Sequence, residues 1–365
     1  MENTPLDTIR QLLRITSQAQ ILLEGDRILA VSPEAQRLFP GVLSGFTAGQ
    51  FFGIDLQQHL EQQQEGSLLF TASILGSRYD VSVTAISPYH LCTVTPAAVV
   101  ENSQTMLSTA QQLRNSLSSI MAAAPKALPL LAQLEDPSAL EQASVVNRGL
   151  YQLLRSTENL ERYAASQLLL NPVRFDMREY FQHLEDTLLP LFADIGLQLE
   201  ILYPPNICPC TADSVLLTQA IMNLLSNAVK YSQPDQMITL ACRVQKGRIL
   251  ISVRDRGQGI PPDQLSVVFF RSEHRGQIPD PKWGAGLGLQ ATRRIIEAHG
   301  GRILLESVEH QGTTVYLSLD AHTSNNSTLH AATVPVVVPS GINAVLVGLS
   351  DVLPARVFHV IDICM

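Results

Sequence analysis

The chain has 365 residues, which suggests two or three domains, and its 45% hydrophobic and 16% charged residues can bury sizeable cores. The formal net charge of −8 offers no basic surface for nucleic acid. No uninterrupted apolar stretch could span a bilayer and no signal peptide is visible, so we expect a cytoplasmic protein that does not contact a membrane.

Residues 1–95 are predicted to form a separate α+β domain. The segment ILLEGDRILAV has the pattern of two strands joined by a Gly-Asp turn, and Ser32 and Pro33 then begin a short helix. The segments GSLLFTASILG, SRYDVSVTAIS and YHLCTVTP alternate polar and apolar residues as three further strands. This order of elements resembles that of PAS-like sensor domains.

Residues 96–170 are predicted to form a helical hairpin. Apolar residues recur at helical spacing over about residues 102–124, and prolines then interrupt the pattern. A second helix begins with Asp136 as a plausible N-cap and Pro137 as its first residue. Two such hairpins would complete a four-helix bundle, so we expect a homodimer, although an ordinary linker coiled coil has the same pattern.

The stretch LTQAIMNLLSNAVKYS, residues 217–232, carries the most informative pattern in the chain. As a helix, it places an apolar stripe on one face and Asn223, Asn227, Lys230 and Tyr231 on another. Asparagine is a mediocre helix former, so two amides one turn apart inside an apolar helix suggest a function. The amide oxygen of Asn227 suits Mg²⁺ and Lys230 suits phosphate, so we interpret the helix as a platform for nucleotide phosphates.

Two further motifs follow this helix. In RILISVRDRGQGI, Asp255 continues the inward-facing row of a strand, where its carboxylate needs a donor such as a purine amino group. Asp255 is also compatible with a plain turn before Gly257. In WGAGLGLQATRR, Gly284, Gly286 and Gly288 alternate and lead into a helix whose N-terminal N–H groups suit an anion.

The order NLLSNAVKYS, DRGQGI, GAGLGL and HGGRILLESVEHQGTTVYLSL resembles the ATP-binding domain of sensor histidine kinases. That family belongs to a wider group that includes gyrase and the heat-shock chaperone ATPases. The resemblance covers about residues 171–320. It implies an α/β sandwich, in which a mixed sheet is covered on one face by helices, with ATP and Mg²⁺ as ligands.

The resemblance also implies a role for each matching residue. Asn227 would hold Mg²⁺, Asn223 would lie beside the γ-phosphate, and Asp255 would accept from the adenine amino group. The remaining nucleotide-binding residues would be Lys230, Tyr231, Gly257, Gly259, Gly284, Gly286, Leu287, Gly288 and Thr313, and residues from about 261 to 283 would form a lid. ATPases of the wider group have a Glu at the position of Asn223. An amide cannot act as a base, so we expect poor hydrolysis of ATP by water.

The hairpin departs from the family at its phosphoacceptor. Family members carry a His followed by an acidic residue, and Gln111 and Gln112 occupy the matching positions. A glutamine amide has no nucleophilic nitrogen, so we expect ordinary self-phosphorylation to be absent. His183 remains a candidate acceptor by its position in the sequence. Asn115 stands where the family places a Thr or Asn that orients water for removing phosphate from a response regulator, and it equally fits an ordinary exposed helix residue.

Residues 321–365 are predicted to be an apolar extension that docks on the protein or on a partner. Three functions stay open for the chain. It could bind ATP and regulate a response regulator or another signalling protein, dephosphorylate a response regulator with Asn115, or phosphorylate a Ser, Thr or His of a partner. Neither nucleic acid nor a membrane is expected among its partners.

Overall fold

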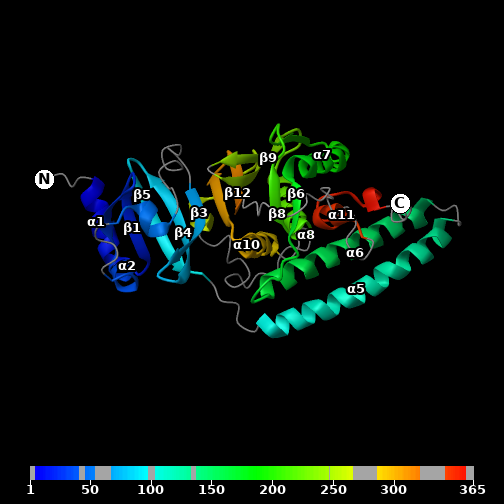
Figure 1. The fold of residues 1–365 in the computed structure, drawn as a ribbon, viewed down its shortest axis with the longest axis horizontal. Coiled ribbons are helices and arrows are strands. Elements are labelled where there is room, and N and C mark those ends of the chain that lie inside the picture. Colours follow the sequence, from blue (N-terminus) through cyan, green and yellow to red (C-terminus); the bar gives the residue numbers. More distant parts are fainter. Residues whose placement is uncertain are drawn as a thin grey trace. The chain divides into compact units, whose positions relative to one another are not determined.

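The computed structural model describes residues 5–40, 46–53, 67–97, 103–132, 137–245, 247–265, 286–320 and 342–358 (Figure 1). The chain divides into two compact units. The first comprises residues 1–99 with the segments 258–270 and 304–314, and the second comprises the rest of the chain. No helix in the described ranges combines the length and apolar character needed to cross a membrane.

The N-terminal part contains the five strands and the short helix that the sequence predicts. Its strands follow the order β2-β1-β5-β4-β3, and neighbouring strands are antiparallel. The hydroxyl of Ser32 caps the short helix by accepting a bond from the Ala35 N–H at 3.2 Å. The elements are α1 (Pro5–Ile15), β1 (Ala19–Glu24), β2 (Arg27–Val31), α2 (Pro33–Leu38), α3 (Ala48–Phe52), β3 (Ser67–Ile74), β4 (Ser77–Ile86) and β5 (Tyr89–Pro96).

Two long helices, α5 (Ser103–Ala132) and α6 (Pro137–Ala164), lie side by side as a hairpin (Figure 1). The sequence predicts that the prolines after residue 124 end the first helix, but α5 continues through both of them. A proline removes one helical hydrogen bond, which packing along a partner helix can outweigh. The predicted apolar stripe is only partly buried, since Leu113 and Ile120 are 50% and 51% exposed.

In the C-terminal half, the strands follow the order β11-β12-β10-β9-β7 in a mixed sheet, and β11 also pairs antiparallel with β3 of the first compact unit. Strand β7 is parallel to β9, and β9 is antiparallel to β10. Helix α8 packs on β10 and on α10, so helices cover the sheet as the α/β prediction requires. The elements are α7 (Met177–Asp194), β7 (Gln198–Leu202), α8 (Ser214–Tyr231), β9 (Met237–Gln245), β10 (Arg248–Arg254), α9 (Pro262–Leu265), α10 (Gly288–Ala298), β11 (Arg302–Val308) and β12 (Gly312–Asp320).

Three smaller pieces complete this half. Strands β6 (Val173–Asp176) and β8 (Pro209–Ala212) form a separate two-stranded sheet. Near the end of the chain, helix α11 (Ala344–Leu349) contacts both α8 and α6, and the 3-10 helix η3 (Ala355–Phe358) contacts α6. The described part of the C-terminal extension therefore packs on α6 of the hairpin and on α8 of its own chain.

A charged layer lies between the two hairpin helices. Arg114 of α5 contacts Glu161 of α6, with 3.1 Å between its Nε and the carboxylate, and Arg162 also lies within ion-pair distance of Glu161. Glu158 lies one turn before Arg162. Burial raises the pKa of the Glu158 carboxyl from 4.5 to about 7, and the Glu161 charge adds to the rise against the opposing effects of Arg162 and Arg114.

This raised pKa predicts a pH-dependent stability of the hairpin. The folded chain holds the Glu158 proton more tightly than the unfolded chain does. The contribution of this proton to the free energy of unfolding is therefore complete below pH 4.5 and is lost as the pH rises through about 7. We expect Glu158→Gln to raise the melting temperature at about pH 8 by roughly 2 °C or more, and to change it little at about pH 5. Glu141→Gln, at an exposed position of the same helix, is the control. An equal shift at both pH values would contradict the assignment.

Candidate functional site

The helix that the sequence singles out is α8, and it is firmly anchored. Asp213 caps its N-terminus, with Oδ1 accepting from the Leu216 N–H at 3.0 Å and Oδ2 from the Asn171 N–H at 2.9 Å. The predicted apolar stripe is at most 2% exposed at Leu217, Ile221, Leu224 and Ala228. The core therefore holds one face of α8 and leaves the polar face to other partners.

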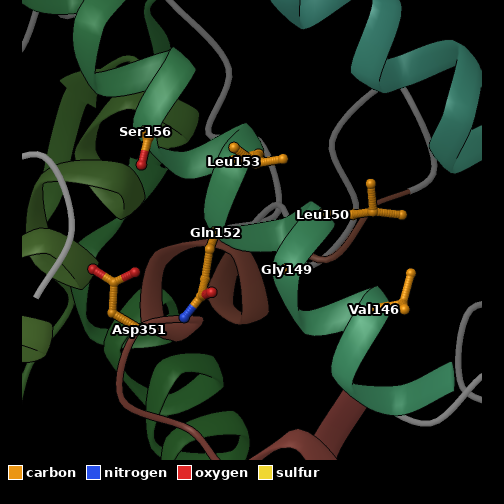
Figure 2. A pocket seen from close by; sticks show the side chains of 7 residues that line it. All are labelled: Val146, Gly149, Leu150, Gln152, Leu153, Ser156 and Asp351. Carbon is orange, nitrogen blue, oxygen red and sulfur yellow. The ribbon is translucent and has the colours of Figure 1, made fainter. Parts of the chain in front are cut away.

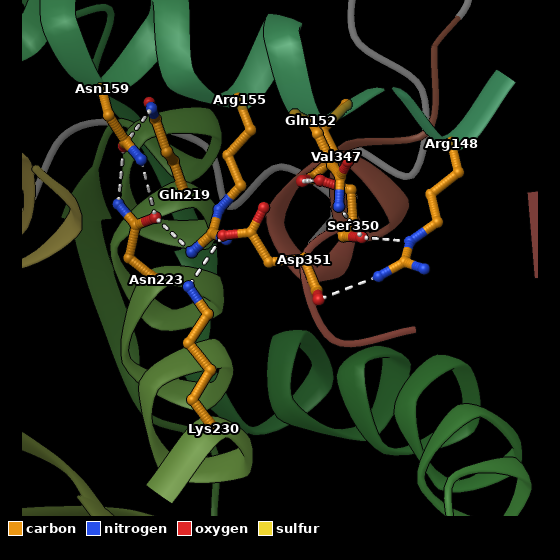
Figure 3. A network of polar contacts seen from close by, with 10 residues as sticks. All are labelled: Arg148, Gln152, Arg155, Asn159, Gln219, Asn223, Lys230, Val347, Ser350 and Asp351. Atoms are coloured by element: carbon orange, nitrogen blue, oxygen red, sulfur yellow. Dashed lines mark hydrogen bonds and ion pairs between the residues drawn. The ribbon is translucent and has the colours of Figure 1, made fainter. Parts of the chain in front are cut away.

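On that polar face, Asn223 is 1% exposed and is bonded to hairpin helix α6 (Figure 3). Its Nδ2 donates to Asn159 Oδ1 at 2.9 Å, and Asn159 Nδ2 returns a bond to Asn223 Oδ1 at 3.2 Å. Arg155 Nη2 donates to the same oxygen at 3.3 Å. The amide of Asn223 thus links α8 to α6 of the hairpin and is held in one orientation by three hydrogen bonds.

Two turns along α8, the Lys230 side chain is 6% exposed and lies against the C-terminal segment (Figure 3). Its Nζ donates to Asp351 Oδ2 at 2.8 Å, and Arg155 contacts the same carboxylate oxygen. Burial lowers the pKa of Lys230, with the nearby Arg155 charge acting in the same direction and Asp351 opposing both. Asn227, between Asn223 and Lys230 along the helix, is half-buried.

Asp255 follows strand β10 and is 9% exposed. Its Oδ1 accepts from the Gly257 N–H at 2.9 Å. This bond forms the turn before Gly257 that the sequence suggests as one of two roles for Asp255. A Cβ on Gly257 would lie 2.1 Å from the Tyr231 carbonyl oxygen, so only glycine lets this turn meet the end of α8. A Cβ on Gly259 would lie 2.0 Å from the Val308 carbonyl oxygen, and its φ of +64° also favours glycine.

The start of α10 completes this neighbourhood. Leu287 occupies the N-cap position without a side-chain hydrogen bond, and Gly286 before it has a φ of +71°. A Cβ on Gly288 would lie 3.4 Å from Asn223 Oδ1, so the N-terminus of α10 meets the polar face of α8. Uncapped N–H groups at a helix N-terminus favour an anion.

Thr313 takes part in a short chain of hydrogen bonds. Its Oγ1 lies 2.9 Å from the Ser307 hydroxyl oxygen, which accepts from the Ile260 N–H at 2.8 Å. The loop that follows Gly259 is thereby tied to the sheet. Thr313 was predicted as a nucleotide-binding residue, and in the structure it stabilises this loop through Ser307.

The remaining predicted residues lie elsewhere. Gly284 and most of the predicted lid, from residue 266 onward, lie outside the described residues. On α5, Gln111, Gln112 and Asn115 are exposed, and the Asn115 carbonyl accepts from the Ser119 hydroxyl at 3.0 Å. His183 is exposed on α7. Among the described side chains, no group of three or more His, Cys, Asp or Glu residues could hold a metal ion.

Three residues of the polar network were not predicted from the sequence. Arg155 and Asn159 of α6 are one helical turn apart within an otherwise leucine-rich pattern, and Asp351 lies in an apolar segment. A charged or amide side chain in apolar surroundings requires a buried partner, so the sequence indicates that these residues are paired. Their partners on α8 could not be deduced, because those partners are distant in the sequence.

The sequence matches known proteins in the region that contains α8 and the motifs that follow it. Residues 212–323 match the family described as histidine kinase-, DNA gyrase B-, and HSP90-like ATPase. The adaptive-response sensory kinase SasA of Synechococcus elongatus is 28% identical over 343 residues, which are 86% of each chain. The alginate biosynthesis sensor protein KinB of Pseudomonas aeruginosa and the histidine protein kinase DivJ of Caulobacter vibrioides are each 31% identical, over 46% and 47% of this chain.

The matches differ in how much of each relative they include. The chain spans 86% of that SasA protein, 50% of the SasA of Microcystis aeruginosa, and 28% of KinB and of DivJ. The solved structure of full-length ShkA in complex with AMPPNP aligns with 60% of this chain and 46% of its own, at 20% identity and a TM-score of 0.47. The chain therefore carries a histidine kinase-type ATPase domain in its C-terminal half, and the ATPase match and the sensor-kinase relatives together support a member of the sensor histidine kinase family.

Proposed function

We propose that this chain binds Mg-ATP at the polar face of α8 and acts in two-component signalling. The observation that carries the proposal is the convergence of three motifs that are separate in the sequence. The turn at Gly257 packs on the carbonyl of Tyr231, and the start of α10 at Gly288 packs on Asn223. The aspartate turn thus meets the end of α8 and the glycine-rich helix start meets its polar face two turns earlier, which supports an ATP site along this face of α8.

Each group in this location suits a part of the nucleotide. The Lys230 ammonium would contact phosphate, and the Asp255 carboxylate, oriented by the Gly257 N–H, would accept from the adenine amino group. The amide oxygen of Asn227 is a hard ligand that suits Mg²⁺. The ion, when bound, would offset the charge of the phosphates.

The Asn223 amide supports the expectation of slow hydrolysis. It has no basic atom that could activate water, and its oxygen is already occupied by Asn159 and Arg155. The site therefore suits binding ATP, or passing phosphate to a presented acceptor, better than consuming ATP. Together with glutamines at positions 111 and 112, this favours a signalling member that does not phosphorylate its own hairpin.

The hairpin also supports the proposed homodimer. Apolar side chains remain open to solvent along both helices, and Val146 and Leu153 of α6 are 62% and 55% exposed. An open groove runs beside them, lined by Val146, Gly149, Leu150, Gln152, Leu153, Ser156 and Asp351 (Figure 2). A second hairpin would bury this apolar face, as in a four-helix bundle.

The N-terminal part would act as a sensor. Its antiparallel sheet carries a core that includes the aromatic side chains of Phe39, which follows α2, Phe52 of α3 and Phe70 of β3. The element order of two strands, helices and three strands supports a PAS-like domain, which is a proposal here. The resemblance to the family also suggests that the chain acts on a response regulator or another signalling protein. A kinase activity toward a separate protein is an alternative that rests on the same resemblance.

A response-regulator phosphatase is the second candidate function, and the exposure of Asn115 favours it. The side chain lies on the solvent side of α5, one turn beyond Gln111, where a docked receiver domain could reach it. An amide there could hold water in line with an aspartyl phosphate. In this mechanism ATP would be a regulatory ligand.

The first prediction concerns the magnesium ligand. Asn227→Ala should weaken ATP binding in the presence of Mg²⁺ by about tenfold or more, because it removes an oxygen ligand of the ion. Isothermal titration calorimetry measures the dissociation constant. Asn206→Ala, at an exposed loop position, is the matched control and should leave the affinity unchanged. Equal affinities for the wild type and the Asn227 variant would remove Asn227 from the site.

The second prediction concerns phosphate transfer within the chain. After incubation with Mg²⁺ and ATP labelled at the γ-phosphate, the purified protein should retain nucleotide on a filter but carry no acid-labile label. The physical reason is the missing nucleophile at Gln111. Label on any histidine, His183 included, would show that the acceptor has moved rather than disappeared.

The third prediction separates the second candidate function from the first. Asn115→Ala should abolish any dephosphorylation of a receiver domain that has been loaded with acetyl phosphate. Gln112→Ala, on the neighbouring exposed position, should preserve it. Unchanged turnover in the Asn115 variant would leave ATP binding and conformational control as the function of the chain.

A further inference from the structure

The C-terminal segment 342–358 is fastened between the hairpin and the ATPase helix. Helix α11 is capped by Asn343, whose Oδ1 accepts from the N–H groups of Val345 and Leu346 at 2.9 and 3.1 Å. Its approach to α8 is close, because a Cβ on Gly348 would lie 2.3 Å from the Cβ of Met222. Glycine at position 348 is therefore required for α11 to pack on α8 in this way. We call residues 342–358 the strap.

Polar side chains of α6 hold the backbone of the strap. Arg148 donates to the carbonyl oxygens of Ser350 and Asp351, each at 3.0 Å, and Gln152 donates to the Ser350 carbonyl at 3.2 Å. Asn147 donates to the Phe358 carbonyl at 3.0 Å. The Ser350 and Asp351 carbonyls follow the end of α11 and the Phe358 carbonyl ends η3, so these bonds satisfy acceptors at the ends of two short helices. The strap is thus bound in a defined register on α6.

Apolar contacts add to this attachment. Phe358 is 1% exposed, and its ring packs on that of Tyr151 of α6 with 5.2 Å between centroids. Three residues of α11 are buried against the rest of the unit, namely Val345, Val347 and Leu349. At the surface, Arg356 bonds to Asp194 of α7 at 3.0 Å. The strap therefore contacts the hairpin and two ATPase helices.

In this register, the Asp351 carboxylate forms ion pairs with two buried cations. Asp351 accepts from Lys230 at 2.8 Å and also contacts Arg155, and all three side chains are between 6% and 8% exposed (Figure 3). One negative charge therefore faces two positive charges. Arg155 Nε is also buried and has no hydrogen-bond partner among the described residues. The cluster thus has a buried donor that a larger anion with more acceptor oxygens could use.

We propose that the strap is a built-in competitor of ATP, in which Asp351 occupies the position that a nucleotide phosphate takes on Lys230. This inference rests on the proposed function, in which Lys230 binds phosphate. A carboxylate beside a phosphate on the same ammonium is repelled by it, so strap and nucleotide exclude each other. When the strap leaves, the nucleotide's phosphates gain Arg155 as a second cation, supplied by the hairpin. Binding is reciprocal, so ATP loosens the strap to the same degree that the strap weakens ATP binding.

The competition also connects the nucleotide to the hairpin. Arg155 bonds to both Asp351 and Asn223, so a phosphate that replaces the carboxylate pulls on a side chain of α6. The strap holds α6 and α8 together through its own contacts, and its release leaves the Asn159–Asn223 pair as a direct polar link. Occupancy of the ATP site would in this way change how tightly the hairpin is attached to the ATPase domain.

Two substitutions in the full-length chain test the proposal. Asp351→Asn removes the competing charge, and Gly348→Leu keeps the charge but prevents α11 from approaching Met222. Each should lower the dissociation constant for ATP, measured by calorimetry with Mg²⁺, by about tenfold or more. Asp186→Asn, which removes an exposed carboxylate of α7, is the charge-matched control and should change nothing. Circular dichroism confirms that each variant is folded.

Hydrogen exchange gives an independent measurement on the wild-type chain. Saturating Mg-ATP should increase deuterium uptake in residues 342–358 and leave residues 5–15 unchanged. Equal ATP affinity in the wild type and both variants would overturn the strap proposal while leaving the ATP site intact. No ATP binding in any of the three proteins would instead overturn the proposed function itself. Tighter binding by both variants, with exchange that rises in the wild type, would establish the competition.

Discussion

The ammonium of Lys230 and the guanidinium of Arg155 are both buried, and much of the polar structure around α8 serves to compensate their charges. A buried cation without a counter-charge is strongly unfavourable, so the fold must bring an anion to this position. In the structure that anion is the carboxylate of Asp351, from the far end of the chain. A nucleotide phosphate would answer the same requirement. The constraint therefore connects the stability of the C-terminal half with its proposed ligand.

The same location connects the hairpin to the ATPase domain. Asn223 and Asn159 exchange two hydrogen bonds, and both side chains are almost fully buried. Buried amides that satisfy each other cost little, whereas either one alone would leave unpaired polar atoms. The pair therefore favours one alignment of α6 on α8. If ATP binds at α8 as proposed, this alignment would connect the nucleotide to the hairpin.

Glycines at two points allow segments to meet closely. A Cβ on Gly257 would lie 2.1 Å from the Tyr231 carbonyl oxygen, and a Cβ on Gly348 would lie 2.3 Å from the Cβ of Met222. Gly257 belongs to a motif that resembles those of histidine kinase ATPases, and Gly348 belongs to the strap. The strap and the proposed ATP site thus both depend on glycine for close contact with α8.

The sequence alone determined the elements and motifs that depend on neighbouring residues. The apolar period of α8, its polar face, the turn from Asp255 to Gly257 and the cap at Ser32 are all encoded within a few residues, where backbone hydrogen bonds are local. Only the tertiary structure decided that Asn223 turns to Asn159 of α6, that Lys230 meets Asp351, and that α5 continues past its prolines. These outcomes depend on how elements distant in the chain pack together, and no local pattern specifies which buried partner a charge will find.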